Sequence, residues 1–191
     1  MRLGVYGGSF DPPHLGHLLP VIDAAEQLDL DGVRFVPAST QPLKVGRASA
    51  SPADRLAMTE RLVQGIPGFS VDPAEIDRPG LSYTVDTLAG LAAANPGAEL
   101  FLLLGADAYA LFDKWREPER IRALATVVVM VRGDSTLTPS ATGEGQVQVL
   151  QSRRVDISST ELRARVRDGR TIRGFMPDAV ADYIVEHRLY R

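Results

Sequence analysis

The sequence predicts a doubly wound α/β fold, in which helices cover both faces of a mostly parallel sheet. Short apolar, β-branched runs alternate with longer segments of helical periodicity along the 191 residues. Residues 100–104 are apolar at every position, as expected for a strand that is covered on both faces. The length and the 45% hydrophobic content also fit one domain with a sizeable core. We therefore expect a single Rossmann-like domain spanning residues 1–191.

The expected strands and helices follow one another in order. The strands are residues 2–6, 33–37, 69–71, 100–104, 127–131 and 147–150. The helices are residues 15–28, 56–63, 83–94, 118–124, 159–167 and 177–187. Apolar residues in the first helix recur at the spacing of one helix face, at Leu18, Ile22, Ala25 and Leu28.

Capping signals mark the ends of two of these helices. Ser51 can cap the helix of residues 56–63, Pro52 suits its first turn, and Asp54 stands at the capping-box position. Gly169 closes the helix of residues 159–167. Residues 133–146 are polar and rich in Gly, Ser and Thr, so we expect a mobile loop there rather than a domain boundary.

Composition excludes several kinds of chemistry. The chain contains no cysteine, which excludes disulfides, iron–sulfur clusters, cysteine zinc sites and a thiol nucleophile. Its formal net charge of −3 gives no general attraction to nucleic acid or to an anionic membrane. No apolar run approaches the roughly 20 residues of a membrane span, and the first residues resemble no secretion signal. We expect a cytoplasmic protein that binds neither nucleic acid nor membrane.

The loop after the first strand is the first candidate ligand site. Residues 7–17 read GGSFDPPHLGH and lead from that strand into the first helix, at the sheet edge where ligands collect. Gly7 and Gly8 let the backbone approach a ligand, and the helix N-terminus offers N–H groups to phosphate oxygens. The loop matches neither the Walker motif nor the G-x-G-x-x-G fingerprint. The sequence therefore does not support P-loop phosphoryl transfer or hydride transfer from a dinucleotide.

His14 and His17 stand three residues apart, so on a helix they share one face. We expect both imidazoles to be exposed and to donate hydrogen bonds to phosphate oxygens. A metal pair is one alternative, but only His187 remains as a further histidine and no cysteine is present. Simple capping of the helix by each histidine is the other alternative.

Residues 153–173 form a second candidate anion site. They contain seven arginines and three acids, which gives a local formal charge of +4. Ser158 with Glu161 three residues later forms a capping-box pattern, so the N–H groups, two hydroxyls and Arg163 form an anion nest at this helix start. We expect only Arg163 to contact phosphate. The remaining arginines of the helix and its following loop should be solvated or face a partner: Arg165, Arg167, Arg170 and Arg173.

Two motifs together resemble a known superfamily. The GGSFDPPHLGH loop resembles the GG[ST]FDPxHxGH signature of the nucleotidyltransferases with an H-x-G-H motif, and residues 157–163, ISSTELR, resemble their second motif. Residues 82–88, SYTVDTL, and residues 104–107, LGAD, followed by Trp115, resemble more narrowly the bacterial nicotinate-nucleotide adenylyltransferases. The chain ending is also similar, so the resemblance covers nearly the whole sequence.

The resemblance implies that ATP and nicotinate mononucleotide are converted to deamido-NAD and pyrophosphate, with Mg²⁺ held mainly by substrate phosphates. An ionised phosphate can attack without a protein nucleophile, since its second pKa lies near 6. The implied catalytic residues are His14, His17 and Arg163. The implied ATP site comprises Gly7, Gly8, Ser9, Phe10, His14, His17, Gly105, Asp107, Ile157, Ser158, Ser159 and Arg163.

The implied acceptor site comprises Lys44, Tyr83, Thr84, Asp107 and Trp115. Trp115 would stack on the pyridine ring, and backbone N–H groups near Thr84 and after Trp115 would receive the carboxylate. Each residue also has a plainer alternative: Trp115 in the core or an interface, Thr84 or Asp107 as a helix cap, and Lys44 on the surface.

Residues 41–44 read QPLK, where many members of the family have PPHK or PPHR, so the basic end is kept and Leu43 replaces the histidine. The sequence also fits an adenylyltransferase for another acceptor, either nicotinamide mononucleotide or phosphopantetheine. A nucleotide-binding regulator without catalysis is a third hypothesis, and a homo-oligomer is compatible with all three.

Overall fold

Six parallel strands form the sheet in the computed structural model, which describes residues 1–39, 50–78, 80–132 and 147–191. The strands are β1 (Arg2–Gly8), β2 (Gly32–Pro37), β3 (Phe69–Val71), β4 (Glu99–Gly105), β5 (Thr126–Arg132) and β6 (Val147–Ser152). Their order across the sheet is β3-β2-β1-β4-β5-β6, and each neighbouring pair is parallel. This is the strand order of a doubly wound sheet, so the predicted fold class is confirmed.

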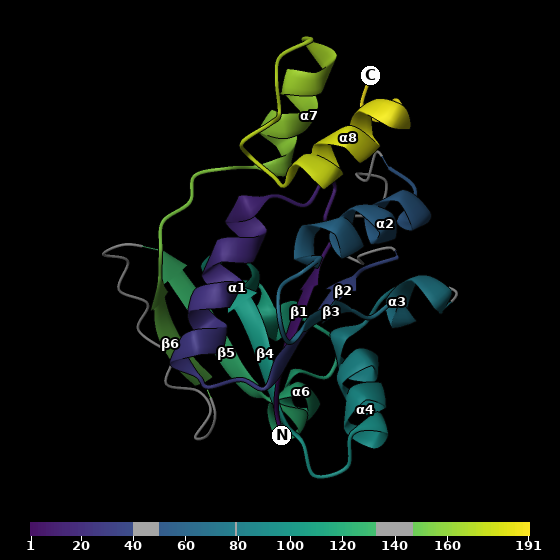
Figure 1. Cartoon of the computed structure of the whole chain (residues 1–191). Coiled ribbons are helices and arrows are strands. Elements are labelled where there is room, and N and C mark those ends of the chain that lie inside the picture. Colours follow the sequence, from purple (N-terminus) through teal and green to yellow (C-terminus); the bar gives the residue numbers. More distant parts are fainter. Residues whose placement is uncertain (40–49, 79, 133–146) are drawn as a thin grey trace.

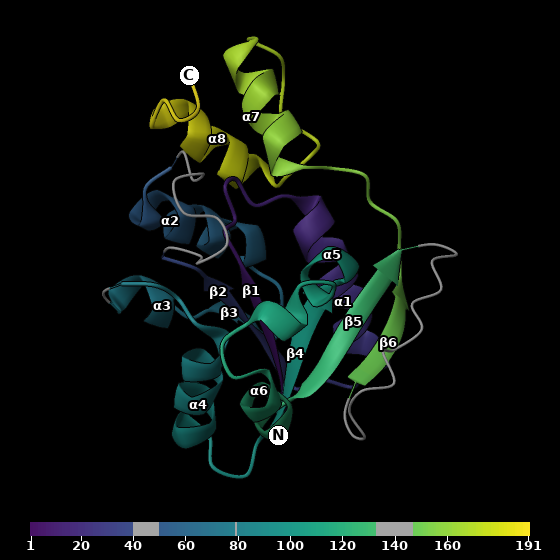
Figure 2. The same ribbon diagram turned by 180° about the vertical axis from the view of Figure 1, so that it is seen from behind.

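Helices cover both faces of the sheet (Figures 1 and 2). One face carries α1 (Leu15–Gln27) and α2 (Pro52–Val63), and the other carries α4 (Thr84–Ala94) and α6 (Pro118–Leu124). The apolar strands divide their side chains between the two faces: Leu103 of β4 joins the first core cluster, whereas Leu102 and Leu104 join the second. This division explains why residues 100–104 are apolar at every position.

The helix starts agree with the capping signals. The Ser51 side chain accepts a hydrogen bond from the Asp54 N–H at 3.1 Å, and Pro52 is the first residue of α2. The helix that Ser51 caps therefore begins at Pro52, four residues before the predicted start at Leu56. Tyr83 is the N-cap of α4 rather than its first helical residue.

Three short helical segments have no counterpart among the predicted elements: α3 (Ala74–Asp77), α5 (Ala106–Tyr109) and the 3₁₀ turn η2 (Phe112–Lys114). Each is about one turn long, which is too short to show a periodic apolar pattern.

The topology places a ligand site at the carboxyl ends of β1 and β4. The strand β1 leads into α1, and β4 leads through α5 and η2 into α6. Because α1 and α6 lie on opposite faces, the direction in which successive strands are added to the sheet reverses between β1 and β4. The last helices, α7 (Ser159–Arg167) and α8 (Asp178–Glu186), lie beyond this edge at the top of Figure 1. In the described ranges no helix is long and apolar enough to cross a membrane. The predicted mobile loop of residues 133–146 lies outside the described residues.

Candidate active site

His14 and His17 together form a capping box at the start of α1. The Nδ1 atom of His14 accepts a hydrogen bond from the Gly16 N–H at 3.1 Å, and Nδ1 of His17 accepts from the His14 N–H at 3.3 Å. An accepting Nδ1 carries no proton, so each neutral ring carries its proton on Nε2. The capping that was an alternative to phosphate binding is therefore present, and the donor of each ring is its Nε2–H.

The expectation that both imidazoles are exposed is wrong. His14 is only 4% exposed and His17 is half-buried, because the two rings pack together with their centroids 3.8 Å apart. A Cβ on Gly16 would lie 2.9 Å from His14 Nδ1, so the glycine of the H-x-G-H motif makes room for the ring. The Phe10 ring packs edge-on against the His17 ring, with the ring centroids 5.3 Å apart.

The second motif contacts the first loop directly. Ser159 Oγ donates a hydrogen bond to the Pro12 carbonyl at 2.8 Å, and the Arg163 guanidinium donates to the Asp11 carbonyl at 2.6 Å. Ser158 caps α7 by accepting from the Glu161 N–H at 3.2 Å, as predicted. The structure thus brings together the two motifs that the sequence separates by more than a hundred residues.

Asp11 anchors the middle of the first loop. Its carboxylate is buried and accepts hydrogen bonds from the Tyr190 hydroxyl at 2.8 Å and from the Ala50 N–H at 3.2 Å. Burial and the adjacent Asp11 charge raise the pKa of Tyr190, so its hydroxyl stays protonated and acts as the donor. Our sequence analysis assigned no role to either residue.

Arg55 is a second residue that sequence reasoning missed. It is 1% exposed, and its guanidinium donates to the carbonyls of Ser9 at 2.9 Å, Ser39 at 2.8 Å and Ala38. Burial lowers the pKa of Arg55, and the charge of Asp11 opposes that shift. The signal was present in the sequence: Arg55 stands three residues before Met58 and seven before Leu62, on the apolar stripe of α2.

The remaining residues assigned to the ATP site surround this loop. Gly7 and Gly8 end β1, and Gly105 ends the neighbouring β4 and is the N-cap of α5. The Ile157 carbonyl would lie 3.3 Å from a Cβ on Gly16, which places the approach to α7 beside the histidine pair. Asp107 is exposed in the first turn of α5, and among the described residues this helix has no side-chain cap, so the alternative that Asp107 caps it is wrong.

Two of the predicted acceptor residues, Tyr83 and Thr84, form the start of α4. Among the described residues this helix has no side-chain cap, so Thr84 does not serve as one. The Arg116 guanidinium stacks 4.7 Å from the centre of the Tyr83 ring, which brings the segment after η2 beside the N-terminus of α4. Trp115 is half-buried and packs against Phe112, with ring centroids 5.4 Å apart. The predicted contribution of Lys44 lies outside the described residues.

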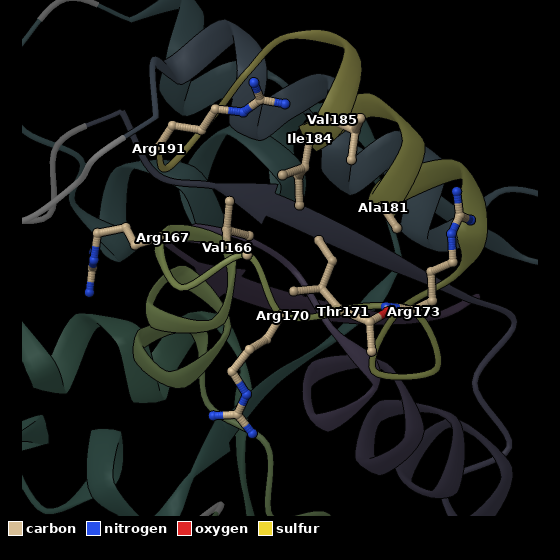
Figure 3. Close-up of a pocket in the computed structure, with 11 residues that line it drawn as sticks. Val166, Arg167, Arg170, Thr171, Arg173, Ala181, Ile184, Val185 and Arg191 are labelled. Atoms are coloured by element: carbon tan, nitrogen blue, oxygen red, sulfur yellow. The ribbon is translucent and has the colours of Figure 1, made fainter.

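The arginines of α7 and of the segment after it lie at two different places. Arg163, in the middle of the helix, lies at the first loop, whereas Arg167, its last residue, and Arg170 line a hollow of about 470 Å³ (Figure 3). Apolar side chains, including Val166 and Ile184, lie between the arginines in this hollow. These positions agree with the expectation that Arg163 has different surroundings from the arginines that follow it.

Two other arginines are more engaged than expected. Arg165 donates to the Thr171 carbonyl at 2.8 Å and stacks on the Phe175 ring at 4.6 Å. Arg173 forms ion pairs with Asp178 at 3.0 Å and with Asp182. These contacts hold the connection between α7 and α8, so neither side chain is simply solvated.

Comparison with known proteins agrees with this fold and shows the family. A family model described as cytidylyltransferase-like matches residues 5–165, and the chain belongs to that family. Over its full length it is 47% identical to a probable nicotinate-nucleotide adenylyltransferase of Gemmatimonas aurantiaca, covering 93% of that relative. It is also 46% identical to a protein of the same description from Thermus thermophilus, and that match covers both chains completely.

A solved structure shares the fold. The Plasmodium falciparum nicotinic acid mononucleotide adenylyltransferase complexed with APC superimposes with a TM-score of 0.80, covering 99% of this chain and 96% of that chain. The identity is 18%, so this likeness concerns the fold alone.

The Asp11–Tyr190 hydrogen bond gives a testable stability effect. Tyr190→Phe should lower the free energy of unfolding by about 1–3 kcal/mol, because a buried carboxylate oxygen loses a donor. Urea denaturation measures the change. Tyr109→Phe is the matched control, since Tyr109 is half-buried and its hydroxyl bonds no described residue. Equal destabilisation by both substitutions would contradict the role of the hydrogen bond.

Proposed function

We propose that this protein transfers the adenylyl group of ATP to nicotinate mononucleotide, which forms deamido-NAD and releases pyrophosphate. The observation that carries the proposal is the meeting of the two motifs, in which Ser159 and Arg163 bond the loop that leads to the histidine pair. The full-length relatives described as nicotinate-nucleotide adenylyltransferases support the same acceptor.

In the proposed reaction, a phosphate oxygen of the mononucleotide attacks the α-phosphorus of ATP. The bond between that phosphorus and the bridging oxygen breaks, and pyrophosphate leaves in line. The attacking phosphate is largely ionised at pH 7, so no protein base has to remove a proton. The chain supplies position and charge stabilisation: the Nε2–H groups of His14 and His17, the Arg163 guanidinium and the backbone N–H groups at helix starts.

Magnesium is expected to arrive with ATP. In the part of the chain that the structure describes, no group of three or more His, Cys, Asp or Glu residues could hold a metal ion. The donor set therefore fits an ion bound mainly by substrate phosphates, and its chemistry would be to neutralise the triphosphate charge. We also propose that the enzyme works in the cytoplasm on these small molecules.

The acceptor is proposed to bind at the N-terminus of α4. This helix start has no side-chain cap among the described residues, so its N–H groups suit a carboxylate. Trp115 packs against Phe112 but is only half-buried. Part of its ring surface is therefore accessible for stacking on a pyridine ring. Lys44 is proposed to meet the phosphate of the mononucleotide.

The histidine pair can be tested in a way that separates capping from catalysis. His17→Ala should reduce adenylyl transfer on the order of 10²-fold or more, because it removes a donor to charge that develops in the transition state. His17→Asn keeps an acceptor near the Nδ1 position without the Nε2–H, so it should be folded and nearly as slow. His17→Gln places an NH₂ near the Nε2 position and should recover part of the rate.

Pyrophosphate release from ATP and nicotinate mononucleotide measures these rates. His187→Ala is the control, because His187 is exposed and its ring stacks on Tyr183 rather than on the histidine pair. A folded His17→Asn enzyme that turned over at the parent rate would show that the ring only caps α1, and it would refute the phosphate role.

The divided arginines of α7 give a second comparison. Arg163→Ala should raise the KM for ATP, and Arg163→Lys should not restore it fully, since an ammonium cannot reproduce the two-pronged guanidinium. Arg167→Ala should be nearly silent, because Arg167 lines the hollow beyond the end of α7 rather than the first loop. Steady-state kinetics with ATP varied would measure both. Equal losses at the two positions would mean that the whole arginine cluster acts as a diffuse positive field.

Acceptor choice tests the proposed substrate itself. Nicotinate mononucleotide should be preferred to its amide by about 10–100-fold in kcat/KM for each backbone donor that the carboxamide leaves unpaired. Trp115→Ala should raise the KM for the mononucleotide and leave that for ATP nearly unchanged. A panel of nicotinate mononucleotide, nicotinamide mononucleotide and phosphopantetheine distinguishes the candidates. Equal use of acid and amide, or a Trp115→Ala defect confined to ATP, would refute this assignment.

A further inference from the structure

Glu75 is a buried acid beside the proposed acceptor site. It lies in α3, is 7% exposed and accepts a hydrogen bond from Thr87 Oγ1 at 2.6 Å. Burial raises the pKa of Glu75, and the Thr87 and Ser82 hydroxyls oppose that shift. The side chain therefore occupies a costly environment, and the hydrogen bond from Thr87 offsets part of that cost.

The hydrogen bond from Ser39 fixes the direction of the Ser82 hydroxyl. Ser82 Oγ accepts from the Ser39 N–H at 3.0 Å, so its own proton is available to Glu75. The Ser39 carbonyl in turn accepts from Arg55, which also holds the Ser9 carbonyl of the first loop. A series of hydrogen bonds thus runs from the first loop through the end of β2 to Ser82.

The Ser82 and Thr87 side chains enclose the segment expected to receive the acceptor. Ser82 immediately precedes Tyr83 and Thr84, and Thr87 follows them within the first turn of α4. Both side chains are buried: Thr87 is hydrogen-bonded to Glu75, and Ser82 is hydrogen-bonded to Ser39. Glu75 therefore fixes the first turn of the helix through Thr87, and the Ser82 hydroxyl helps to lower the pKa of Glu75.

We propose that Glu75 is a positioning residue that sets the N-terminus of α4 for recognition of the acceptor carboxylate. The inference rests on the proposed function, because it assigns to α4 the donors that distinguish acid from amide. Glu75 contacts no substrate in this arrangement and acts through Thr87. A carboxylate suits this task because either of its oxygens can accept from the Thr87 hydroxyl, whereas an amide offers only one acceptor oxygen.

The test uses Glu75→Gln, Glu75→Ala and Thr87→Val, with Asp77→Ala as the control. Asp77 ends the same short helix and is exposed. Glu75→Ala should raise the KM for nicotinate mononucleotide about tenfold and lower the acid-to-amide ratio of kcat/KM about tenfold, the effect of one misplaced buried donor. The KM for ATP should change less than about twofold. Glu75→Gln and Thr87→Val should give intermediate values, and Asp77→Ala should match the parent.

A purely structural role predicts a different pattern. It would lower thermal stability while the KM for the mononucleotide and the acid-to-amide ratio stayed at parent values, and that result would overturn the proposal. Equal increases in both KM values would overturn it as well. If Glu75→Ala does not fold, the near-isosteric Glu75→Gln and Thr87→Val decide the question by the same two readouts.

Failure of the proposed function would be visible separately, in the parent enzyme. It would show no pyrophosphate release with nicotinate mononucleotide, and the variants would then be compared on the acceptor that the parent does use. Under that outcome an unchanged KM for that acceptor in Glu75→Ala and Glu75→Gln would refute the positioning role, whereas a selective increase would support it.

Discussion

The arrangement of the site depends on one buried carboxylate, that of Asp11. Its side chain accepts hydrogen bonds from Tyr190 and Ala50, and its backbone carbonyl accepts from Arg163. The first loop is therefore held by the start of α2, by α7 and by the end of the chain at a single residue. A buried charge is costly, and here its hydrogen bonds and the nearby charge of Arg55 offset that cost. The histidine pair begins three residues later, so its position follows from this anchor.

A second constraint concerns the distance between the two proposed substrate sites. An in-line transfer requires the two reacting groups to be held in a fixed relation. In this fold the end of β2 supplies that relation, because Ser39 bonds Arg55 through its carbonyl and Ser82 through its N–H. Arg55 holds the first loop and Ser82 precedes α4, so the short segment after β2 supports both sides of the proposed reaction.

The sequence was sufficient for the sheet, because strands and helix starts depend on local patterns. Short apolar runs identified the strands, and the Ser51 and Ser158 caps identified helix starts. The resemblance assigned the two motifs to one ATP site. The sequence failed for His14, whose burial depends on the space that Gly16 leaves for its ring. The partners of Asp11 and Glu75 were also beyond prediction, since such side-chain contacts depend on how separate elements pack. The helical periodicity of α2 could have identified Arg55 as a buried residue.

The contacts that complete the first loop join residues that are very distant along the chain. Ser159 is 147 residues from Pro12, Arg163 is 152 from Asp11, and Tyr190 is 179 from Asp11. Such contacts form late in folding, because a long loop must close first. The central strands can thus assemble before the first loop is fixed, and α7 and α8 can detach locally while the sheet persists. A ligand that binds only when Arg163 is in place then stabilises the docking of α7 and α8 on the sheet. The concentration of nucleotide would therefore control the fraction of molecules in which these two helices are docked.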